Sequence, residues 1–469
     1  GRGGGKVLDS RNLSVPWAQL RDVATDLFCQ LRVRQSRKQF CERDIWIMPK
    51  ISFPVFKNEL ESKNSGRAAR ILRRIPFVLT FQQRVELFYG FIRSDRKHMD
   101  SAGVNFQHGA GVGIRVRRDR VLTDGFESLT KIGQNIKGRV QVQFINSHGI
   151  PETGIDGGGL FKEFVTELLR SAFDPQLGLF CQTPHEFTYP NPTSFANPNF
   201  GEQHLAYFQF VGMVVGKCLY DGIILEPQFA NFFLRKLLGY RNFVDDLSSL
   251  DPEVYKNLLY LKKNSASGLG LTFSVARDTF GDSKVVDLVP NGSNIAVTDE
   301  NRLRFIYEMA DFKLNREIAP QSKAFVAGLN SVIKPDWLRM FEAEELDRLV
   351  SGTPVIDVAD LKRHTNYAGG YDENHEVIRW FWSILDHDMD ESDRRSFLKF
   401  STSVSRSPLL GFRHLYPKFC IQRSSGDTDN LPTSSTCMNL LKLPRYATKA
   451  KLREKLLYSI KSSSGFYLT

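Results

Sequence analysis

Residues 431–444 read L-P-T-S-S-T-C-M-N-L-L-K-L-P, and the interpretation of the whole chain depends on the cysteine in this stretch. A polar, turn-rich run leads into it and an apolar run leaves it, so Cys437 is expected where a surface loop meets the core. A free thiol has a pKa of about 8.5, and the few per cent of thiolate present at neutral pH is already a strong nucleophile. No activating base stands beside Cys437 in the sequence. A small buried cysteine without a chemical role is therefore the alternative.

The pattern continues as R-Y, an amphipathic helix and a short Gly-Phe tail, and it resembles the catalytic loop of the HECT-domain ubiquitin ligases. The resemblance runs from about residue 75 to residue 469 and is strongest to the ubiquitin-protein ligase 3B/3C branch and its plant relatives. It implies an α+β bilobal HECT fold, with a mostly helical N-terminal lobe that has small β elements, a hinge, and a smaller α/β C-terminal catalytic lobe. It also implies that Cys437 accepts ubiquitin as a thioester and passes it to a substrate lysine.

Domain boundaries are expected where composition changes and where the resemblance places them. The expected units are a helical N-terminal extension and linker (1–74), the N-terminal lobe (75–350, with a conjugating-enzyme-binding subdomain at about 251–315), a hinge (351–356) and the catalytic lobe (357–469). In the family, the hinge lets the catalytic lobe swing between the conjugating enzyme and the substrate. The hinge is expected after a helix that ends in Ser351 and Gly352.

Apolar spacing predicts several elements. Residues 16–37 carry an apolar residue about once per helical turn and predict one long amphipathic helix that packs on another part of the protein; its apolar residues are Leu20, Val23, Leu27 and Leu31. The polar stretch 57–67 is the best candidate for a linker. Thr80 and Gln83 have the spacing of a capping box at the start of a helix.

Alternation and helical spacing predict three more elements. Apolar residues alternate with polar ones from Val140 to Phe144, which predicts a half-buried strand. A second strand is expected near residues 269–275. A final helix is expected to end near Gly465, and its buried face would carry Leu452, Leu456, Leu457 and Ile460.

A glycine-rich stretch, E-T-G-I-D-G-G-G-L-F-K-E-F, spans residues 152–164. Glycines before a helix can bind phosphate, but the spacing matches neither G-x-G-x-x-G nor G-K-[ST], so nucleotide binding is not expected. From the residues alone, Asp156 caps the helix and the glycines allow close backbone packing. By resemblance, Asp156 lies near the interface between the lobes and positions or deprotonates the incoming lysine; the capping role alone stays open.

The resemblance assigns three further sets of residues. The groove for the conjugating enzyme would use Val254, Leu258, Leu269, Leu271, Phe305 and Met309. An apolar groove of this kind is physically reasonable, because a few buried anchors carry most of an interface. Tyr207 matches a position that binds a second, noncovalent ubiquitin in some members, with a core aromatic as the alternative. Phe466 corresponds to a phenylalanine that docks the catalytic lobe during transfer.

Composition excludes several classes of protein. The six cysteines lack C-x-x-C spacing, so neither a disulfide scaffold nor a metal site is expected, and no cofactor is implied. The apolar runs are shorter than the ~18 residues of a membrane span. The net charge of +11 comes without an RNA-binding or recognition-helix signature, so nucleic acid is not an expected partner.

The expected partners, as the resemblance implies, are ubiquitin, a conjugating enzyme and protein substrates, in the cytoplasm or also the nucleus. The start G-R-G-G-G-K is not a signal peptide and is expected to mark a fragment.

Two alternatives to the ligase remain open from the sequence. A cysteine hydrolase would pair Cys437 with a histidine, the candidates being His364, His375, His387 and His414, although no signature of such enzymes surrounds the cysteine. A ubiquitin-binding scaffold would keep the fold without catalysis. Many family members have a histidine two residues before the cysteine, whereas this chain has Ser435, so the base must come from elsewhere.

Overall fold

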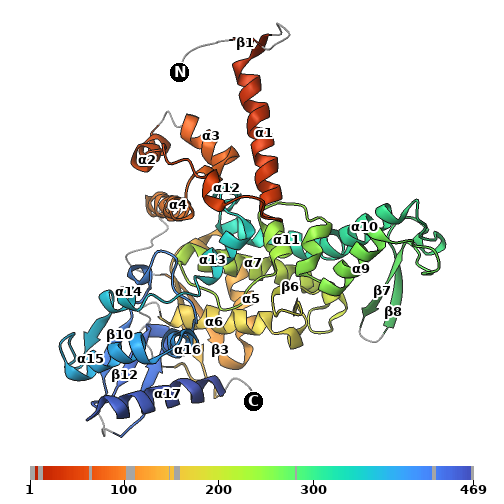
Figure 1. Cartoon of the computed structure of the whole chain (residues 1–469). Coiled ribbons are helices and arrows are strands. Elements are labelled where there is room, and N and C mark those ends of the chain that lie inside the picture. The colour runs from red at the N-terminus through yellow and green to blue at the C-terminus, as the bar shows by residue number, and fades with distance from the viewer. Residues whose placement is uncertain are drawn as a thin grey trace.

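Buried apolar side chains form two large clusters, one drawn from residues 85–350 and the other from residues 356–460. They correspond to two lobes in the ribbon diagram of the computed structural model (Figure 1). The structure describes residues 6–8, 14–62, 66–101, 111–146, 148–152, 159–279, 282–424 and 429–465. Helices dominate and the sheets are small, so the fold is α+β, as the sequence predicts. Within the described residues, no helix combines the length and apolar character needed to cross a membrane.

The centre of the N-terminal lobe is a pair of closely packed helices, α7 (His204–Asp221) and α11 (Ala319–Val332). A Cβ atom at Gly212 would overlap the carbonyl of Phe325, and one at Gly328 would overlap the carbonyl of Gln209. Glycine at these two positions therefore lets the two backbones touch, which buries the apolar face of each helix.

Helices and a two-stranded sheet cover this pair. Helix α4 (Phe81–Ser101) begins with the predicted capping box, because Thr80 N donates to Gln83 Oε1 at 2.9 Å and Gln83 N donates to Thr80 Oγ1 at 3.2 Å. Strand β3 (Val112–Arg117) runs parallel to β4 (Val140–Ile145), whose inward face is apolar as predicted. The other elements of this lobe are α5 (Val121–Ile132), α6 (Gly159–Phe173), β5 (Phe180–Gln182), β6 (Thr188–Pro190), α8 (Asn231–Leu237), α12 (Pro335–Leu338) and α13 (Ala343–Ser351).

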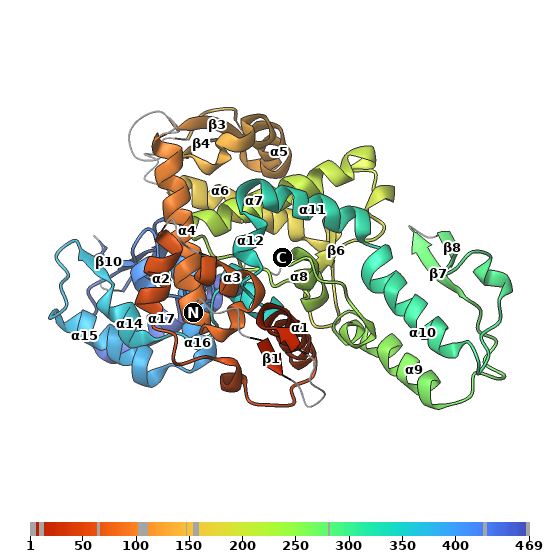
Figure 2. The same ribbon diagram turned by 90° about the horizontal axis from the view of Figure 1, so that it is seen from above.

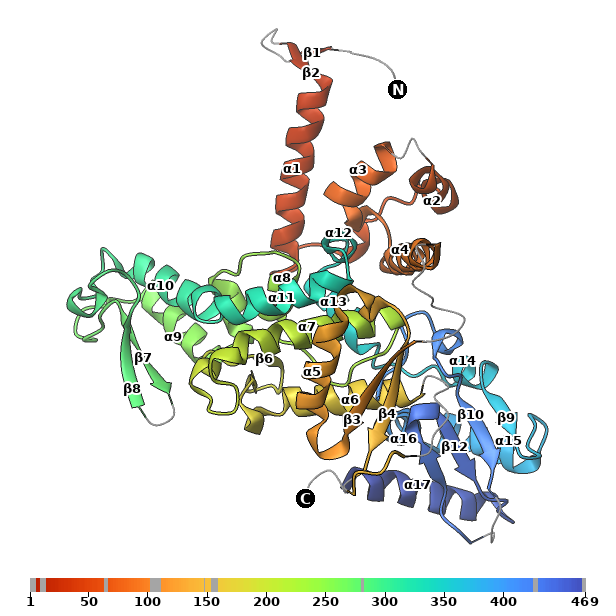
Figure 3. The same ribbon diagram turned by 180° about the vertical axis from the view of Figure 1, so that it is seen from behind.

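One subdomain projects from the N-terminal lobe. It contains α9 (Pro252–Lys263), the hairpin β7–β8 (Ser274–Thr279 and Asp282–Asp287) and α10 (Arg302–Asp311). The strand expected from residue 269 begins only at Ser274, because Gly268 and Gly270 have φ values of +83° and +61°, which are incompatible with an extended strand. All three views place this subdomain at the end of the molecule opposite the C-terminal lobe (Figures 1, 2 and 3).

The C-terminal lobe is built on a four-stranded sheet with the order β11-β12-β10-β9. Strand β12 (Leu440–Leu443) pairs antiparallel with β11 (Thr433–Ser435) and parallel with β10 (Cys420–Arg423), which is also parallel to β9 (Asn366–Ala368). The helices of this lobe are α14 (Val358–Arg363), α15 (Glu376–Ser383), α16 (Glu391–Thr402) and α17 (Lys449–Gly465). Leu452, Leu456 and Ile460 of α17 are buried, as their spacing predicts.

The N-terminal part holds β1 (Lys6–Leu8), β2 (Ser14–Pro16), α1 (Trp17–Gln35), α2 (Phe53–Glu61) and α3 (Gly66–Arg74). Helix α1 stands out from the body (Figure 1), and Leu20, Val23, Leu27 and Leu31, which were expected to pack, stay exposed, Val23 by 62%. The prediction of a linker at 57–67 was wrong at both of its ends, because α2 covers residues 57–61 and α3 covers residues 66–67, while residues 63–65 lie outside the described residues. Phe56 and Ala68 are buried in a small cluster with Leu79 and Leu87, and this contact with the N-terminal lobe stabilises helices that the local sequence does not predict.

Candidate active site

Cys437 lies on the tight turn that joins β11 to β12 at the edge of the C-terminal sheet. The turn is a single 3-10 turn, Thr436–Met438, and Cys437 within it is half-buried. Asn439 ends the turn with φ +49° in the left-handed region, which asparagine tolerates better than most residues. Local backbone chemistry therefore places Cys437 at the point where the chain reverses before the central strand β12.

Asn439 ties this turn to the rest of its lobe. Its backbone N–H donates to Thr436 O at 3.2 Å, and its carbonyl accepts from Cys420 N at 3.0 Å. Its side-chain Nδ2 donates to the carbonyl of Pro417. The residue is fully buried, so each of these bonds forms in a desolvated environment where losing a partner is costly.

The N-terminal lobe packs directly against the same turn through the first residues of α6. A Cβ atom at Gly159 would lie 3.0 Å from Cys437 O and 2.8 Å from Met438 Sδ, so only glycine permits this approach without a shift. One turn further along, the buried Lys162 donates from Nζ to Asn439 Oδ1 at 2.6 Å, to Thr402 O at 2.9 Å and to Thr436 O at 3.4 Å. Cys437 is thus held between the two lobes.

The surroundings set the charge state of the thiol. Burial is the largest cause that raises the pKa of Cys437, and the carboxylate of Glu163 raises this pKa further. The backbone N–H groups of Cys437 and Met438 and the ammonium of Lys162 lower it, but by less. Burial also lowers the pKa of Lys162 to about 8. In this arrangement the thiol is mostly protonated at neutral pH.

The four histidines considered for a cysteine hydrolase have other partners. His364 Nδ1 lies 2.9 Å from Asp360 O, and His375 Nδ1 accepts from Val377 N at 3.2 Å. His387 lies by Asp386, and His414 stacks on Tyr89 with their ring centroids 6.4 Å apart. These contacts give no support for a pairing of Cys437 with any of the four histidines.

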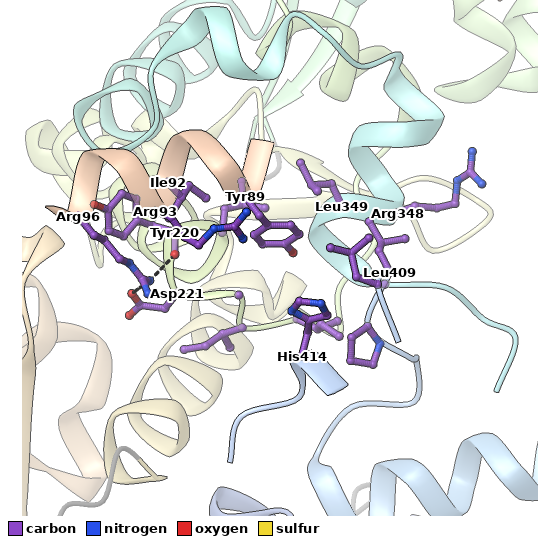
Figure 4. A pocket seen from close by; sticks show the side chains of 17 residues that line it. Tyr89, Ile92, Arg93, Arg96, Tyr220, Asp221, Arg348, Leu349, Leu409 and His414 are labelled. Atoms are coloured by element: carbon purple, nitrogen blue, oxygen red, sulfur yellow. Dashed lines mark hydrogen bonds and ion pairs between the residues drawn. The ribbon is translucent and has the colours of Figure 1, made fainter. Parts of the chain in front are cut away.

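A second contact between the lobes lies beside the expected hinge. It encloses a cavity of about 150 Å³. The cavity is lined by side chains of α4, α7 and α13 and by residues 408–410 and His414 of the C-terminal lobe (Figure 4). Tyr89 of α4 faces His414 across this cavity, and burial raises the pKa of Tyr89 to about 12. Gly352 ends α13 with φ +77°, as the predicted stop at Ser351 and Gly352 requires.

The six residues predicted to form the groove lie in the projecting subdomain. Leu269 and Leu271 are exposed and Val254 is half-buried, whereas Leu258, Phe305 and Met309 are buried between α9 and α10. A partner that approaches this surface would meet the two loop leucines first. Their role in binding a conjugating enzyme stays a prediction.

The other predicted residues are placed as follows. Tyr207 is buried and stacks on Phe126 with ring centroids 4.2 Å apart, which is the core environment given above as the alternative. Asp156 and Phe466 lie outside the described residues. Within the described part of the chain, no group of three His, Cys, Asp or Glu side chains could hold a metal ion.

Lys162 and Asn439 are the two site residues that the sequence did not reveal. The sequence hints weakly that Lys162 is buried, because it stands between the apolar residues Phe161 and Phe164 at the start of a helix, and both are buried. Asn439 follows Cys437 by two residues in a turn, where asparagine is common. Neither signal indicates that the two side chains meet.

Comparison with known protein families matches residues 166–469 to the HECT domain, a ubiquitin-transferase domain. The chain is 40% identical to a probable E3 ubiquitin protein ligase of Schizosaccharomyces pombe, covering 98% of this chain and 47% of that protein. It is 41% identical to ubiquitin-protein ligase E3B of Homo sapiens (93% and 44% covered) and 38% identical to E3 ubiquitin-protein ligase UPL6 of Arabidopsis thaliana (95% and 43%). The chain spans about half the length of these curated relatives.

Proposed function

The chain belongs to the HECT-domain family of ubiquitin transferases, and we propose that it accepts ubiquitin from a conjugating enzyme on Cys437 and transfers it to a substrate lysine. The observation that carries this proposal is the position of Cys437, on a turn that both lobes contact, inside the stretch that matches the family domain. A reactive cysteine that must meet two different partners in turn needs such a position between two bodies.

The proposed reaction is two acyl transfers. In the first, the thiolate of Cys437 attacks the carbonyl carbon of the ubiquitin thioester on the conjugating enzyme, and the thiolate of that enzyme leaves. In the second, a lysine amine attacks the new thioester, loses a proton, and expels the Cys437 thiolate to leave an amide. Positioning of the reacting groups can account for several kcal/mol of such a barrier. Asp156 is the proposed acceptor of the lysine proton.

The partners of the first step are also part of the proposal. The subdomain with Leu269 and Leu271 would bind the conjugating enzyme, and residues 351–356 would act as the hinge on which the catalytic lobe turns toward it. Ubiquitin, conjugating enzymes and protein substrates are the proposed partners, in the cytoplasm or also the nucleus. Phe466 would dock the catalytic lobe during transfer, and Tyr207 would serve a second ubiquitin only if its ring left the core.

A nonreducing gel tests the reaction class. The chain is mixed with ubiquitin, activating enzyme, ATP and a panel of conjugating enzymes, and each product is divided with and without thiol reductant. A ligase gives an adduct of one ubiquitin that disappears with reductant, followed by reductant-resistant conjugates. A hydrolase would instead release free ubiquitin from preformed conjugates. A scaffold would do neither, and the absence of an adduct with every conjugating enzyme would contradict the proposal.

A further inference from the structure

One lysine of the N-terminal lobe reaches into the C-terminal lobe beside residues 436–439, the turn that carries Cys437 and is named the catalytic turn for its proposed role. Lys162 is 6% exposed, and its three acceptors among the described residues, Asn439 Oδ1, Thr402 O and Thr436 O, all belong to the other lobe. Within the described part of the chain, Lys162 forms no ion pair with a carboxylate. Its ammonium therefore loses its water shell on docking, and the hydrogen-bond partners that it regains among the described residues come from the C-terminal lobe.

The chain holds a second buried lysine that serves as a natural comparison. Lys217 of α7 is also nearly fully buried and donates to Gly138 O at 2.9 Å and to Lys137 O at 3.3 Å. It forms an ion pair with Asp221 at 2.8 Å. All of its partners lie in its own lobe. The two lysines thus share burial, and they differ in whether their bonds cross between the lobes and in whether they pair with a carboxylate.

The acceptors of Lys162 are parts of the catalytic turn and of the helix behind it. Thr436 is the residue before Cys437, Asn439 is the residue that ends the turn, and Thr402 ends α16. A donor fixed at this point sets both the distance and the rotation of the turn relative to α6. Removing the donor leaves Asn439 Oδ1 buried without this bond, which favours separation of the lobes.

We propose that Lys162 is a positioning residue that holds the catalytic lobe docked on the N-terminal lobe for transfer of ubiquitin from Cys437 to lysine. The inference rests on the proposed function, because it assigns Lys162 to one of its two steps. The arrangement seen here is that of the second step. The subdomain predicted to bind the conjugating enzyme lies at the far end of the molecule from the catalytic lobe in all three views (Figures 1, 2 and 3). With the catalytic lobe docked on α6, the two regions lie at opposite ends of the molecule, so loading requires that the lobes separate.

Gly159 gives an independent observation for the same arrangement. Its missing side chain makes room for Cys437 O and Met438 Sδ, and these contacts exist only when the lobes are docked. In a separated state, none of the atoms that crowd a Cβ at Gly159 would remain near it, because all three belong to Cys437 and Met438. Alanine is a better helix former than glycine, so Gly159→Ala is expected to leave the N-terminal lobe as stable as before.

The experiment separates the two steps in single turnover. Wild type, Lys162→Met, Lys217→Met and Gly159→Ala are each loaded from a ubiquitin-charged conjugating enzyme, and the rate of adduct formation is recorded. The loaded proteins are then isolated and mixed with free lysine, and the loss of the reductant-sensitive adduct is followed. Thermal unfolding of each variant shows whether it is folded.

The expected result is specific to one step. Lys162→Met and Gly159→Ala load within about twofold of wild type, but each discharges to lysine roughly tenfold or more slowly, because the catalytic turn is no longer held in register. Lys217→Met lowers the unfolding temperature and changes the ratio of the two rates by no more than about twofold.

Several outcomes would overturn the inference. It is wrong if Lys162→Met and Gly159→Ala discharge as fast as wild type, or if loading falls as much as discharge. If Lys162→Met does not fold, Gly159→Ala decides alone. Failure of the proposed function has a different signature, because wild type itself would then form no adduct.

Discussion

Lys162 Nζ donates to Asn439 Oδ1 at 2.6 Å, across the interface between the lobes and between residues 277 positions apart in the chain. Asn439 also donates to Pro417 O inside its own lobe, so one amide group connects the catalytic turn to both lobes. The environment of Cys437 therefore depends on the docked arrangement. Its charged neighbours Lys162 and Glu163 both come from α6.

The pH dependence of the free thiol follows from this environment. Because burial and Glu163 raise the pKa of Cys437 above its ordinary value, the thiolate fraction is small at neutral pH and grows with rising pH. Alkylation of Cys437 by iodoacetamide should therefore accelerate from pH 7 and continue to accelerate above pH 9. Peptide mass spectrometry measures the rate for each cysteine. An alkylation rate that levels off below pH 8 would show that the thiol is not desolvated in this way.

Glu163→Gln should move that pH profile in a known direction. Removing the negative charge beside Cys437 removes one of the causes that raise its pKa, so the alkylation curve should shift to lower pH. Lys162→Met should shift the curve in the same direction, because separation of the lobes removes both the burial and the Glu163 carboxylate that raise the pKa of Cys437. Cys218 is fully buried and should remain unreactive in all three proteins, which serves as the control for folding. Curves that match the wild-type curve for both variants would contradict the docked arrangement in solution.

Leu269 and Leu271 should affect loading and leave discharge unchanged. Both side chains are exposed on the projecting subdomain, so Leu269→Ala and Leu271→Ala are expected to fold normally. Truncation of an anchor residue costs about 1–2 kcal/mol or more of binding, so loading should slow by roughly fivefold or more at low concentrations of conjugating enzyme. Val285→Ala, an exposed residue of β8 outside the predicted set, is the matched control. Normal loading of both leucine variants would place the binding surface elsewhere.

Arg84 and Glu345 should be the most sensitive pair for stability of the N-terminal lobe. Both are buried, and the guanidinium of Arg84 donates to both carboxylate oxygens at 2.6 and 2.7 Å and also to Met340 O at 2.7 Å. Arg84→Met leaves a buried carboxylate without its charge partner, which is expected to cost about 3–5 kcal/mol. Urea unfolding measures the loss. Arg339→Met, which breaks an exposed pair with Asp336, should cost less than about 1 kcal/mol.

Local sequence patterns predicted several elements well, because their causes are local. The capping box of Thr80 and Gln83 and the alternation from Val140 to Phe144 need only neighbouring residues to form, and both were confirmed. The same is true of the final helix, whose apolar face is set by its own spacing.

Contacts between distant residues could not be predicted in this way. Helices α2 and α3 are stabilised by burial of Phe56 and Ala68 against Leu79 and Leu87, and nothing in the polar stretch 57–67 indicates this. The bond from Lys162 to Asn439 depends on how two lobes dock, which no periodicity encodes. The prediction that Cys437 is the reactive cysteine came from its flanking residues and stays a prediction.

The central claim is that Cys437, and no other cysteine, carries ubiquitin. Intact mass spectrometry of the chain after reaction with a ubiquitin-charged conjugating enzyme tests it, with Cys437→Ala and Cys420→Ala side by side. Cys420 is the matched control, since it is half-buried in the neighbouring strand β10. The account predicts that wild type and Cys420→Ala gain the mass of one ubiquitin, removable by reductant, and that Cys437→Ala gains none. A reductant-sensitive adduct on Cys437→Ala would contradict it.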